Sequence, residues 1–449
     1  MSATERFLHQ LGSFGDAEAV VSHAGVTSYA QLVDGARRLR DQIEGAGIRP
    51  GDVVALHAPH SARASEALLA LAEANAISVP IAAVPGEKRR EFHDVGQVEW
   101  VVEVEGDSSE PHIAATGRRA DHALYELLRT KSVAGLVLFS SGTTGRSKAS
   151  VLNLELMLDG YAERRTAQRT LSFLNLDHIG GINTLLHTLS QGGAVITVPD
   201  RTPERVFETI ERDRVSVLPT TPTFLTMTLI SGAHQKYDTS SLRLITYGTE
   251  PMPQQTLERL ATDLPHVRLK QTYGLSELGI MATKSRANDS VWIQLGGAGF
   301  DFKVIDGVLW IKSKLAMLGY LNAPAPFDDE GYFNTQDAVE VDGEYLHILG
   351  RTSELINVGG EKVYPNEVES VLLEMSNIAD VTVSGRPNPV TGSVVQAAIR
   401  LIAPEDSRSL RKRVDEHCAT RLEPYKIPAA ITVSVSDHHN DRFKKVRVS

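Results

Sequence analysis

The sequence predicts an α/β protein with a large N-terminal domain and a small C-terminal domain, and three observations support this class. The chain has 449 residues, more than one hydrophobic core usually serves, since domains average about 100–200 residues. Helical patterns alternate with short apolar runs over residues 1–285, short strands with tight turns follow, and the α/β texture returns after residue 350. We therefore expect two α/β sheet layers and a small β-rich subdomain within residues 1–350, and a small, mobile α+β domain at residues 351–449.

The first half of the chain alternates helix and strand signals. Residues 29–48 have an amphipathic pattern that ends near Gly47, and glycine commonly follows the end of a helix. Strands are expected at 53–56, 77–80, 136–139, 193–198, 215–218 and 242–247, and further helices at 62–76 and 202–213. Strands that alternate with helices are joined by crossover connections, so these sheets should be mainly parallel.

Residues 291–349 show two hairpin signals instead. Asp306-Gly307 and Asp342-Gly343 each lie between apolar runs, and Asp-Gly in that position is typical of a tight β-hairpin turn. These signals predict the β-rich subdomain. Beyond it we expect a helix at 365–375, strands at 381–384 and 394–401, and a helix at 409–422.

Composition excludes several classes of protein. Cys418 is the only cysteine, so an intramolecular disulfide and a cysteine-based zinc site are excluded and a reducing, cytoplasmic setting is expected. Residues 1–7 lack a basic, then apolar, leader pattern, and no later window holds 18 uninterrupted apolar residues, so we expect neither secretion nor a membrane span. A net charge of -10 opposes nucleic-acid binding, which usually needs a basic surface.

The loop after the strand at 136–139 carries the strongest chemical signal. It reads Ser140-Ser141-Gly142-Thr143-Thr144-Gly145-Arg146-Ser147-Lys148. Glycines let the backbone approach an anion, hydroxyls and backbone N–H groups donate to phosphate oxygens, and Lys148 adds a positive charge. The alternative is a Gly/Ser-rich surface turn. The loop fits neither the Walker A pattern nor the Gly-x-Gly-x-x-Gly fingerprint.

This loop resembles the phosphate loop of the adenylate-forming superfamily, which contains acyl-CoA synthetases, peptide-synthetase adenylation domains and luciferases. The family pattern is Ser-Ser/Thr-Gly-Thr-Thr-Gly-x-Pro-Lys-Gly, so Ser147 and Ala149 depart from it. Six motifs match in order, and they are closest to those of stand-alone acyl- or aryl-CoA ligases. The resemblance implies that ATP and AMP are bound by Ser140, Ser141, Gly142, Thr143, Thr144, Gly145, Lys148, Gly248, Thr249, Glu250, Tyr273, Gly274, Ser276, Asp337 and Arg351.

Two later motifs complete the implied nucleotide site. The segment 271–277 resembles the family's Tyr-Gly-x-Thr/Ser-Glu, in which Tyr273 would stack on the purine and Glu277 would hold Mg²⁺, a cation that prefers oxygen ligands. Taken alone, such a segment is more often an ordinary turn. The segment 332–337 resembles Tyr-x-Thr-Gly-Asp, with Gln336 where glycine is usual, and Asp337 would accept the ribose hydroxyls. The alternative for Asp337 is a strand-end turn cap.

The C-terminal motifs imply a thiol acceptor and a catalytic lysine. Gly359 and Gly360 match the loop that lines the pantetheine tunnel of CoA ligases, and Ser353 lies at the family's hinge position. The Lys-x-x-Arg spacing near the C-terminus selects Lys444 as the catalytic lysine. Lys445 is a competitor one position away, and without the resemblance both would be read as solvated charges.

The acid-binding side is less defined. His178 falls on the family's gating position, although a structural histidine is the alternative. Amino-acid-activating relatives place Asp after the gate, where this chain has Ile179, and an apolar group cannot compensate a buried ammonium. A register shift to Asp177 would change that inference. With Tyr247 and other apolar neighbours, the predicted pocket suits an aryl or short acyl acid.

These features predict an enzyme that uses Mg²⁺ and ATP to adenylate a carboxylic acid and then transfers the acyl group to a thiol. CoA and the phosphopantetheine of an acyl carrier protein are the two candidate acceptors. One rival is an adenylating enzyme with a nitrogen acceptor. The other is a catalytically silent nucleotide-binding homologue, suggested by Ser147, Gln336 and Phe443, which depart from the family motifs.

Overall fold

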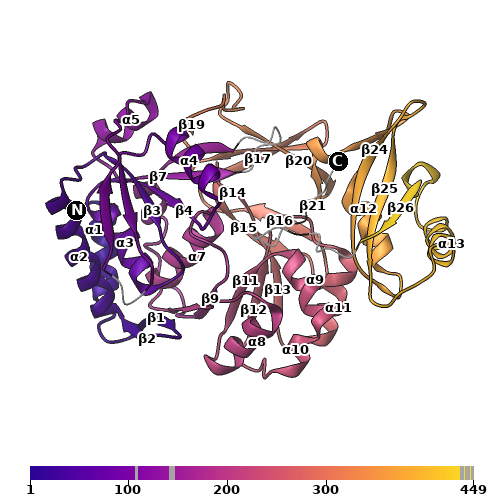
Figure 1. The fold of residues 1–449 in the computed structure, drawn as a ribbon, viewed down its shortest axis with the longest axis horizontal. Helices are drawn as coiled ribbons and strands as arrows, with labels where there is room; N and C mark the ends of the chain where they lie inside the picture. Colours follow the sequence, from indigo (N-terminus) through magenta and orange to yellow (C-terminus); the bar gives the residue numbers. More distant parts are fainter. Residues whose placement is uncertain (107–109, 141–146, 435–438, 440–444, 446–449) are drawn as a thin grey trace.

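The computed structural model describes residues 1–106, 110–140, 147–434, 439 and 445. Figure 1 shows an N-terminal sheet layer at the left, a second layer at the lower centre, a β-rich sheet above it and the C-terminal domain at the right. The predicted α/β fold class is confirmed, including the β-rich part and the separate small α+β unit. The predicted boundary at residue 350 falls in the last residues of a strand and stays a prediction.

The first sheet has the strand order β19-β8-β7-β4-β3-β5-β6. Its inner strands are parallel, as expected, and β6, β8 and β19 run antiparallel to their neighbours. Buried apolar residues from both sheet faces explain why the inner strands read as continuous apolar runs. The strands are β3 (Val53–His57), β4 (Ile77–Ile81), β5 (Trp100–Glu103), β6 (His112–Ala115), β7 (Gly135–Ser140), β8 (Lys148–Asn153) and β19 (Gly319–Tyr320).

Six helices belong to this part of the chain. The helix expected at 29–48 ends at Ala46, because Gly47 takes a left-handed φ of 106° and stops it. The helix expected at 62–76 ends earlier, at Glu73. The helices are α1 (Ala3–Gly12), α2 (Tyr29–Ala46), α3 (Ala62–Glu73), α4 (Gly86–Val95), α5 (Ala123–Lys131) and α6 (Leu154–Asp159).

The second sheet has the order β13-β12-β11-β9-β10-β1-β2 and is parallel except for β2. Its β1 comes from the N-terminus and pairs with β10, so the two layers are not simply consecutive in sequence. The strands are β1 (Glu18–Ser22), β2 (Gly25–Ser28), β9 (Arg169–Ser172), β10 (Ala194–Thr197), β11 (Val217–Thr220), β12 (Leu244–Tyr247) and β13 (Arg268–Gln271). The helices are α7 (Ile179–Ser190), α8 (Pro203–Arg212), α9 (Pro222–Ser231), α10 (Ala233–Lys236) and α11 (Gln254–Asp263).

The third sheet has the order β14-β15-β16-β21-β20-β18-β17 and its pairings are antiparallel. Both predicted Asp-Gly hairpins are present, and Asp306 and Gly307 take the positive φ values of 52° and 75° that such a turn requires. The sheet begins at Tyr273, earlier than the expected 291. The strands are β14 (Tyr273–Leu275), β15 (Gly279–Ser285), β16 (Trp292–Gly296), β17 (Phe300–Ile305), β18 (Val308–Ser313), β20 (Phe333–Asp342) and β21 (Tyr345–Arg351).

The C-terminal unit has its own apolar core, which is built from residues between Ile356 and Cys418. A long hairpin of β24 and β25 forms its centre. Two helices, α12 (Pro365–Leu373) and α13 (Ser407–Cys418), belong to this unit, and α12 contacts β24. The strands are β22 (Ile356–Val358), β23 (Glu361–Val363), β24 (Ile378–Asn388), β25 (Gly392–Leu401) and β26 (Ala430–Val433), and the 3₁₀ turns are Thr352–Glu354 and Pro424–Lys426.

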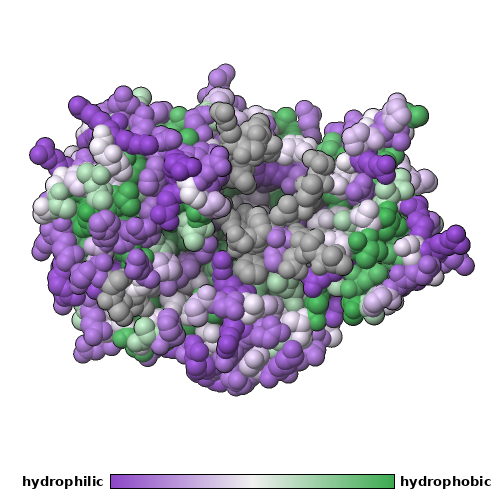
Figure 2. Space-filling view, in the orientation of Figure 1, coloured by the Kyte–Doolittle hydropathy of each residue, from purple (hydrophilic) through white to green (hydrophobic). Residues whose placement is uncertain are grey.

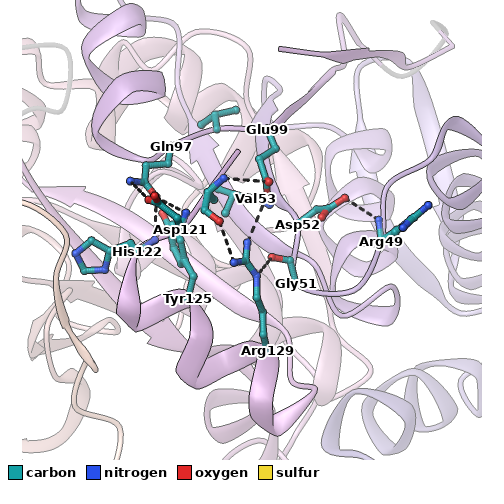
Figure 3. Close-up of polar contacts among 12 residues, drawn as sticks. Arg49, Gly51, Asp52, Val53, Gln97, Glu99, Asp121, His122, Tyr125 and Arg129 are labelled. Carbon is teal, nitrogen blue, oxygen red and sulfur yellow. Dashed lines mark hydrogen bonds and ion pairs between the residues drawn. The ribbon is translucent and has the colours of Figure 1, made fainter. Parts of the chain in front are cut away.

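A buried polar network fastens α5 to the amino end of the first sheet (Figure 3). The Glu99 carboxylate accepts the N–H of Val53 at 2.9 Å and that of Ala120 at 3.0 Å. Arg129 of α5 donates to the carbonyl of Gly51 at 3.1 Å and lies 3.6 Å from Glu99. The contacts lie at the opposite strand ends from the loop after β7, so they stabilise the scaffold without occupying the candidate site.

The surface facing the viewer in Figure 2 is mostly hydrophilic, and its main apolar patch lies over the C-terminal unit. That unit carries exposed Val390, Ile402 and Val433. Within the described residues, every helix is too short or too polar to span a bilayer.

Adding a methyl group at each of two helical glycines, Gly181 and Gly45, should have opposite effects on the free energy of unfolding. In Gly181→Ala at the start of α7, the new Cβ would lie 2.0 Å from the backbone oxygen of Asn175, a clash that should lower the free energy of unfolding by at least about 1–3 kcal/mol. In Gly45→Ala, at an exposed position of α2, no atom lies within 4 Å of the new Cβ. Alanine is the better helix former, so the free energy of unfolding should rise by about 0.5–1 kcal/mol. Urea denaturation measures both, and equal effects would contradict the close packing of α7.

Candidate active site

The phosphate-loop candidate lies between two paired strands. Ser140 ends β7 and Lys148 begins β8, and the two residues are cross-strand partners. Asn322 fastens the exit of the loop, because its side chain accepts the N–H of Ala149 at 3.1 Å and donates to the carbonyl of Ser147 at 2.8 Å. Five of the predicted phosphate ligands, Ser141, Gly142, Thr143, Thr144 and Gly145, lie outside the described residues.

A buried carboxylate on β20 gathers the predicted ribose residues. The hydroxyl of Tyr273 donates to Asp337 Oδ2 at 2.5 Å, and Arg351 Nε lies 3.1 Å from Asp337 Oδ1. The backbone N–H of Asp337 also donates to Thr335 Oγ1 at 3.1 Å. Three residues that the sequence places in separate motifs, at 273, 337 and 351, are therefore in direct contact.

A second buried carboxylate joins this cluster to the first sheet. Tyr320 of β19 donates its hydroxyl to Glu277 Oε1 at 2.7 Å. Lys148 Nζ lies 5.3 Å from the centre of the Tyr320 ring, within the range of a cation–π contact. Tyr320 therefore links the predicted metal ligand Glu277 to the predicted phosphate ligand Lys148.

Burial sets the protonation chemistry of this cluster. Burial raises the pKa of Asp337, and the nearby Arg351 guanidinium opposes the rise. Burial and the charge of Asp337 raise the pKa of Tyr273 well above its usual range. Burial and then Glu277 likewise raise the pKa of Tyr320. Both tyrosines therefore stay protonated at neutral pH and act as hydrogen-bond donors to the two carboxylates.

Gly248, Thr249 and Glu250, which the resemblance assigns to ATP and AMP binding, directly follow β12. Gly248 is buried, and an added Cβ would lie 2.6 Å from the backbone oxygen of Thr272, so this position requires glycine. Gly274 is similar, with Gly279 O 2.8 Å from its would-be Cβ. Thr249 adopts a left-handed φ of 74°, a strained conformation that is often found at binding sites. Ser276 is buried beside Glu277.

Three strand ends beside this segment carry polar atoms without a partner. Thr220, Tyr247 and Gln271 are paired in register across β11, β12 and β13, and paired residues project to the same face of a sheet. Among the described residues, Thr220 Oγ1, the Tyr247 hydroxyl and Gln271 Oε1 have no hydrogen-bond partner although they are buried. Buried polar atoms normally find partners, so a contact that the described residues do not supply would satisfy these three atoms.

The residues predicted for the acid pocket are divided between two faces of the second sheet. The buried Tyr247 ring belongs to the core under α8, α9 and α11. His178 caps the N-terminus of α7 and Ile179 begins that helix, which packs with Val195 on the other face. The structure therefore does not bring Tyr247 to Ile179. Asp177 is buried directly before His178.

Lys270 is a cation that no sequence motif singles out. It is paired in register with Thr246, so it lies on the face opposite Tyr247, which is the face that α7 covers. Among the described residues no carboxylate forms an ion pair with it, and its half-buried position, followed by Arg268 and Arg165, lowers its pKa.

The predicted thiol loop is an exposed hairpin turn between β22 and β23. Gly359 and Gly360 take φ values of 65° and 98°, which explains the choice of glycine. The N–H of Gly359 donates to Thr391 O and that of Gly360 to Asn357 Oδ1, both at 2.8 Å. Lys444, the predicted catalytic lysine, lies outside the described residues.

Sequence reasoning missed Tyr320 and Asn322. Both lie about 170 residues after the loop that they support, so only the pairing of β19 with β8 brings them there. The short Gly319-Tyr320 pair, an aromatic next to a glycine with a left-handed φ of 154°, was the one available signal.

The chemistry of the described donors is compatible with Mg²⁺ and ATP. Glu277 and Asp337 supply carboxylate oxygens, and Lys148 and Arg351 supply positive charge. Within the part of the chain that the structure describes, no three His, Cys, Asp or Glu side chains gather as a metal site.

Comparison with known proteins places this geometry in a family. The chain is 27% identical to the long-chain-fatty-acid–CoA ligase FadD13 of Mycobacterium tuberculosis, covering 90% of this chain and 88% of that protein. It is 28% identical to the feruloyl-CoA synthase of an Amycolatopsis species, covering 92% and 91%. The fold superposes with a TM-score of 0.84 on the crystal structure of the anthranilate CoA ligase AuaEII in complex with anthranoyl-AMP, at 20% identity, covering 99% of this chain and 95% of that one.

Two family profiles match the sequence. That of the AMP-binding enzymes matches residues 7–321, and that of the AMP-binding enzyme C-terminal domain matches residues 367–442. Because the first match alone spans well over half of the chain, the protein belongs to the family of AMP-binding enzymes.

Proposed function

We propose that the protein is an acid–thiol ligase that adenylates an aryl or short acyl carboxylic acid with Mg·ATP and passes the acyl group to a thiol. The observation that carries the proposal is the cluster of the buried Asp337, Tyr273 and Glu277 with the half-exposed Arg351, whose members come from three separate family motifs. The thiol is CoA or the phosphopantetheine of a carrier protein. A cytoplasmic setting fits the single cysteine.

In the first step, a carboxylate oxygen of the acid attacks the α-phosphorus of ATP, the new O–P bond forms and the bond to pyrophosphate breaks. The contribution of the protein is in-line positioning and neutralisation of charge. We assign Thr143, Thr144 and Lys148 to the phosphates, Glu277 to Mg²⁺ and Asp337 to the ribose. Lys444 is assigned to the carboxylate and the α-phosphate.

In the second step, the thiol attacks the acyl carbon, the C–S bond forms, AMP leaves and the thiol proton passes to solvent. We assign the Gly359-Gly360 turn to the thiol path, which requires the C-terminal unit to rotate near Ser353 between the steps. A turn with two positive-φ glycines is exposed and narrow, as a surface beside a slender pantetheine arm must be.

On the acid side, His178 and Ile179 at the start of α7 are proposed to meet the acid. Ile179 leaves an α-ammonium without a counter-charge, which disfavours amino acids. Lys270, on the same face of the sheet, offers a positive charge for a second anionic group.

A pyrophosphate-exchange assay tests the proposal. The panel contains aryl and short acyl acids, each with and without a second carboxylate, and the α-amino acids as controls. Exchange with at least one non-amino acid, followed by thioester formation on addition of CoA or a carrier protein, is expected. Product formed only with an amine would favour the nitrogen-acceptor rival, and exchange with no acid would favour the silent homologue.

Replacing Asp337 tests the ribose assignment. Asp337→Asn should raise the KM for ATP by about 10- to 100-fold, the loss of one or two charge-assisted hydrogen bonds. Because burial raises the pKa of Asp337, the wild-type carboxylate protonates as the pH falls at a higher pH than an ordinary aspartate, near 4, and ATP binding should weaken there. The variant should lose that pH dependence.

The matched control is Asp342→Asn. Asp342 lies on the same strand but is exposed, and among the described residues it pairs only with Arg286. The Asp342→Asn variant should therefore keep the wild-type KM for ATP. An equal rise in both variants would show that the ribose assignment is wrong.

Lys444→Ala tests the catalytic lysine. Adenylation should fall by about 10²–10³, the scale for one charge-stabilising donor, while thioester formation from supplied acyl-adenylate is kept. Lys412→Ala on exposed α13 is the control and should change neither half-reaction. Equal loss in both half-reactions of Lys444→Ala would instead indicate a structural role.

Gln336→Gly tests whether glutamine at this position, where the family motif has glycine, harms the site. Gln336 adopts a left-handed φ of 60°, where a side chain costs about 1 kcal/mol. The variant should therefore unfold at a higher urea concentration and keep its KM for ATP. Gln294→Gly, in the ordinary strand β16, should be destabilised by about 0.5–1 kcal/mol. A Gln336→Gly variant that loses stability would show that its side chain has another function.

A further inference from the structure

Lys445 is deeply anchored in the C-terminal unit. Its Nζ lies 3.3 Å from Glu369 Oε2 and 3.6 Å from Asp380 Oδ1, and it donates to the carbonyl of Val381 at 2.8 Å. The side chains of Lys445 and Glu369 are only 8% and 1% exposed. The other oxygen of Glu369 accepts the N–H of Val383 at 2.9 Å. The Lys445 ammonium group is thus a buried charge that is compensated by two carboxylates and a carbonyl of its own unit, and it does not face the nucleotide site.

The backbone of the same residue is held by the N-terminal part of the chain. The N–H of Lys445 donates to Glu250 Oε2 at 3.1 Å, while Glu250 Oε1 accepts the N–H of Thr223 at 2.7 Å in the first turn of α9. Negative charge at a helix N-terminus is favourable. The carboxylate of Glu250 therefore connects a fixed helix end to the C-terminal segment.

The contact is closely packed. The residues around it, which include Glu250, Glu369 and Lys445, enclose a cavity of about 10 Å³, room for no more than one water molecule. Glu250 also belongs to the segment 248–250 that the resemblance assigns to ATP and AMP, so a single side chain connects the predicted nucleotide site with Lys445.

We propose that Lys445 is a positioning residue, whose side chain is anchored in the C-terminal unit and whose amide docks on Glu250, and that this double attachment serves the catalytic role predicted for its neighbour Lys444. This inference rests on the proposed adenylation. It resolves the competition between the two adjacent lysines, because one of them is engaged by two carboxylates of its own domain.

The two sets of contacts differ in what a domain rotation would do to them. Glu369 on α12 and Asp380 on β24 belong to the same unit as the Lys445 side chain, so those contacts move with the unit. The bond to Glu250 crosses between units and must break when the C-terminal unit turns for the thiol step. Glu250 docking therefore belongs to the adenylation arrangement alone.

Lys445→Met tests the anchor, with Lys444→Ala and Lys445→Arg as matched variants in the full-length enzyme. Misplacement of a catalytic group by about 1 Å costs on the order of 10²-fold, so Lys445→Met should lower pyrophosphate exchange by up to about that factor. Thioester formation from supplied acyl-adenylate should be kept, and Lys445→Arg should restore most of the exchange.

Three results would overturn the proposal. Wild-type exchange in Lys445→Met would show that no anchor is needed. Equal loss in both half-reactions would show a general structural role. Exchange that persists in Lys444→Ala but disappears in Lys445→Met would make Lys445 the catalytic lysine.

A second measurement keeps the test independent of folding and of the proposed function. Lys445→Met leaves Glu369 buried without its cation, which is destabilising, so Lys445→Met/Glu369→Gln removes that charge as well and should fold with near wild-type thermal stability. Hydrogen exchange should show fast exchange of the Lys445 amide in both variants and protection in the wild type. Absence of pyrophosphate exchange with every acid would refute the proposed function. Hydrogen exchange at the Lys445 amide would still test the anchor, and fast hydrogen exchange of this amide in the wild type would refute the anchor.

Discussion

Two buried carboxylates, Asp337 and Glu277, are the constraint on which the arrangement of the three N-terminal sheets depends. Each sits in the third sheet or at its edge, and each is bound by a tyrosine, Tyr273 for Asp337 and Tyr320 for Glu277. A buried carboxylate is costly unless it is hydrogen-bonded and paired. Arg351 forms an ion pair with Asp337, and Lys148 lies over the ring of Tyr320, the tyrosine that binds Glu277. Each carboxylate is therefore held by a tyrosine hydroxyl and has a cation nearby.

This charge arrangement explains why strands from different sheets meet here. Tyr320 comes from the edge strand of the first sheet, and Asp337 and Arg351 from adjacent strands of the third. Gly248 and Gly274 permit the close approach of backbones beside them. A ligand that contacts Gln271 and Thr220 as well as the two carboxylates would bridge the second and third sheets, so binding would favour their observed packing.

Much of the fold could be predicted from local patterns, because turn chemistry and strand alternation are local. Asp306-Gly307 forms the hairpin that its sequence demands, and Gly47 ends α2. Pairings between distant segments could not be predicted in this way. The pairings of β1 with β10 and of β19 with β8 cannot be recognised from the hydrophobic pattern of these strands. For the site, the motifs assigned Asp337, Tyr273 and Arg351 to the nucleotide but not to contact with one another, while Tyr320, Asn322 and Lys270 depend on such distant pairings. Periodicity gives the alternation of faces but not which face a helix covers, so it could not tell that Tyr247 lies in the core under α8, α9 and α11 while Ile179 begins a helix on the other face.

Glu250 links the nucleotide to the position of the C-terminal unit by simple thermodynamics. Its two oxygens are shared between the N-terminus of α9 and the amide of Lys445. If ATP fixes the backbone of the segment 248–251, the carboxylate is pre-positioned for Lys445, and docking of Lys445 in turn holds that segment for ATP. Such coupling is reciprocal, since each partner must raise the affinity for the other by the same factor. If adenylate formation and release of pyrophosphate change the backbone of this segment, the same coupling weakens the docking of Lys445. Glu250 would then be the residue through which the state of the nucleotide affects the position of the C-terminal unit.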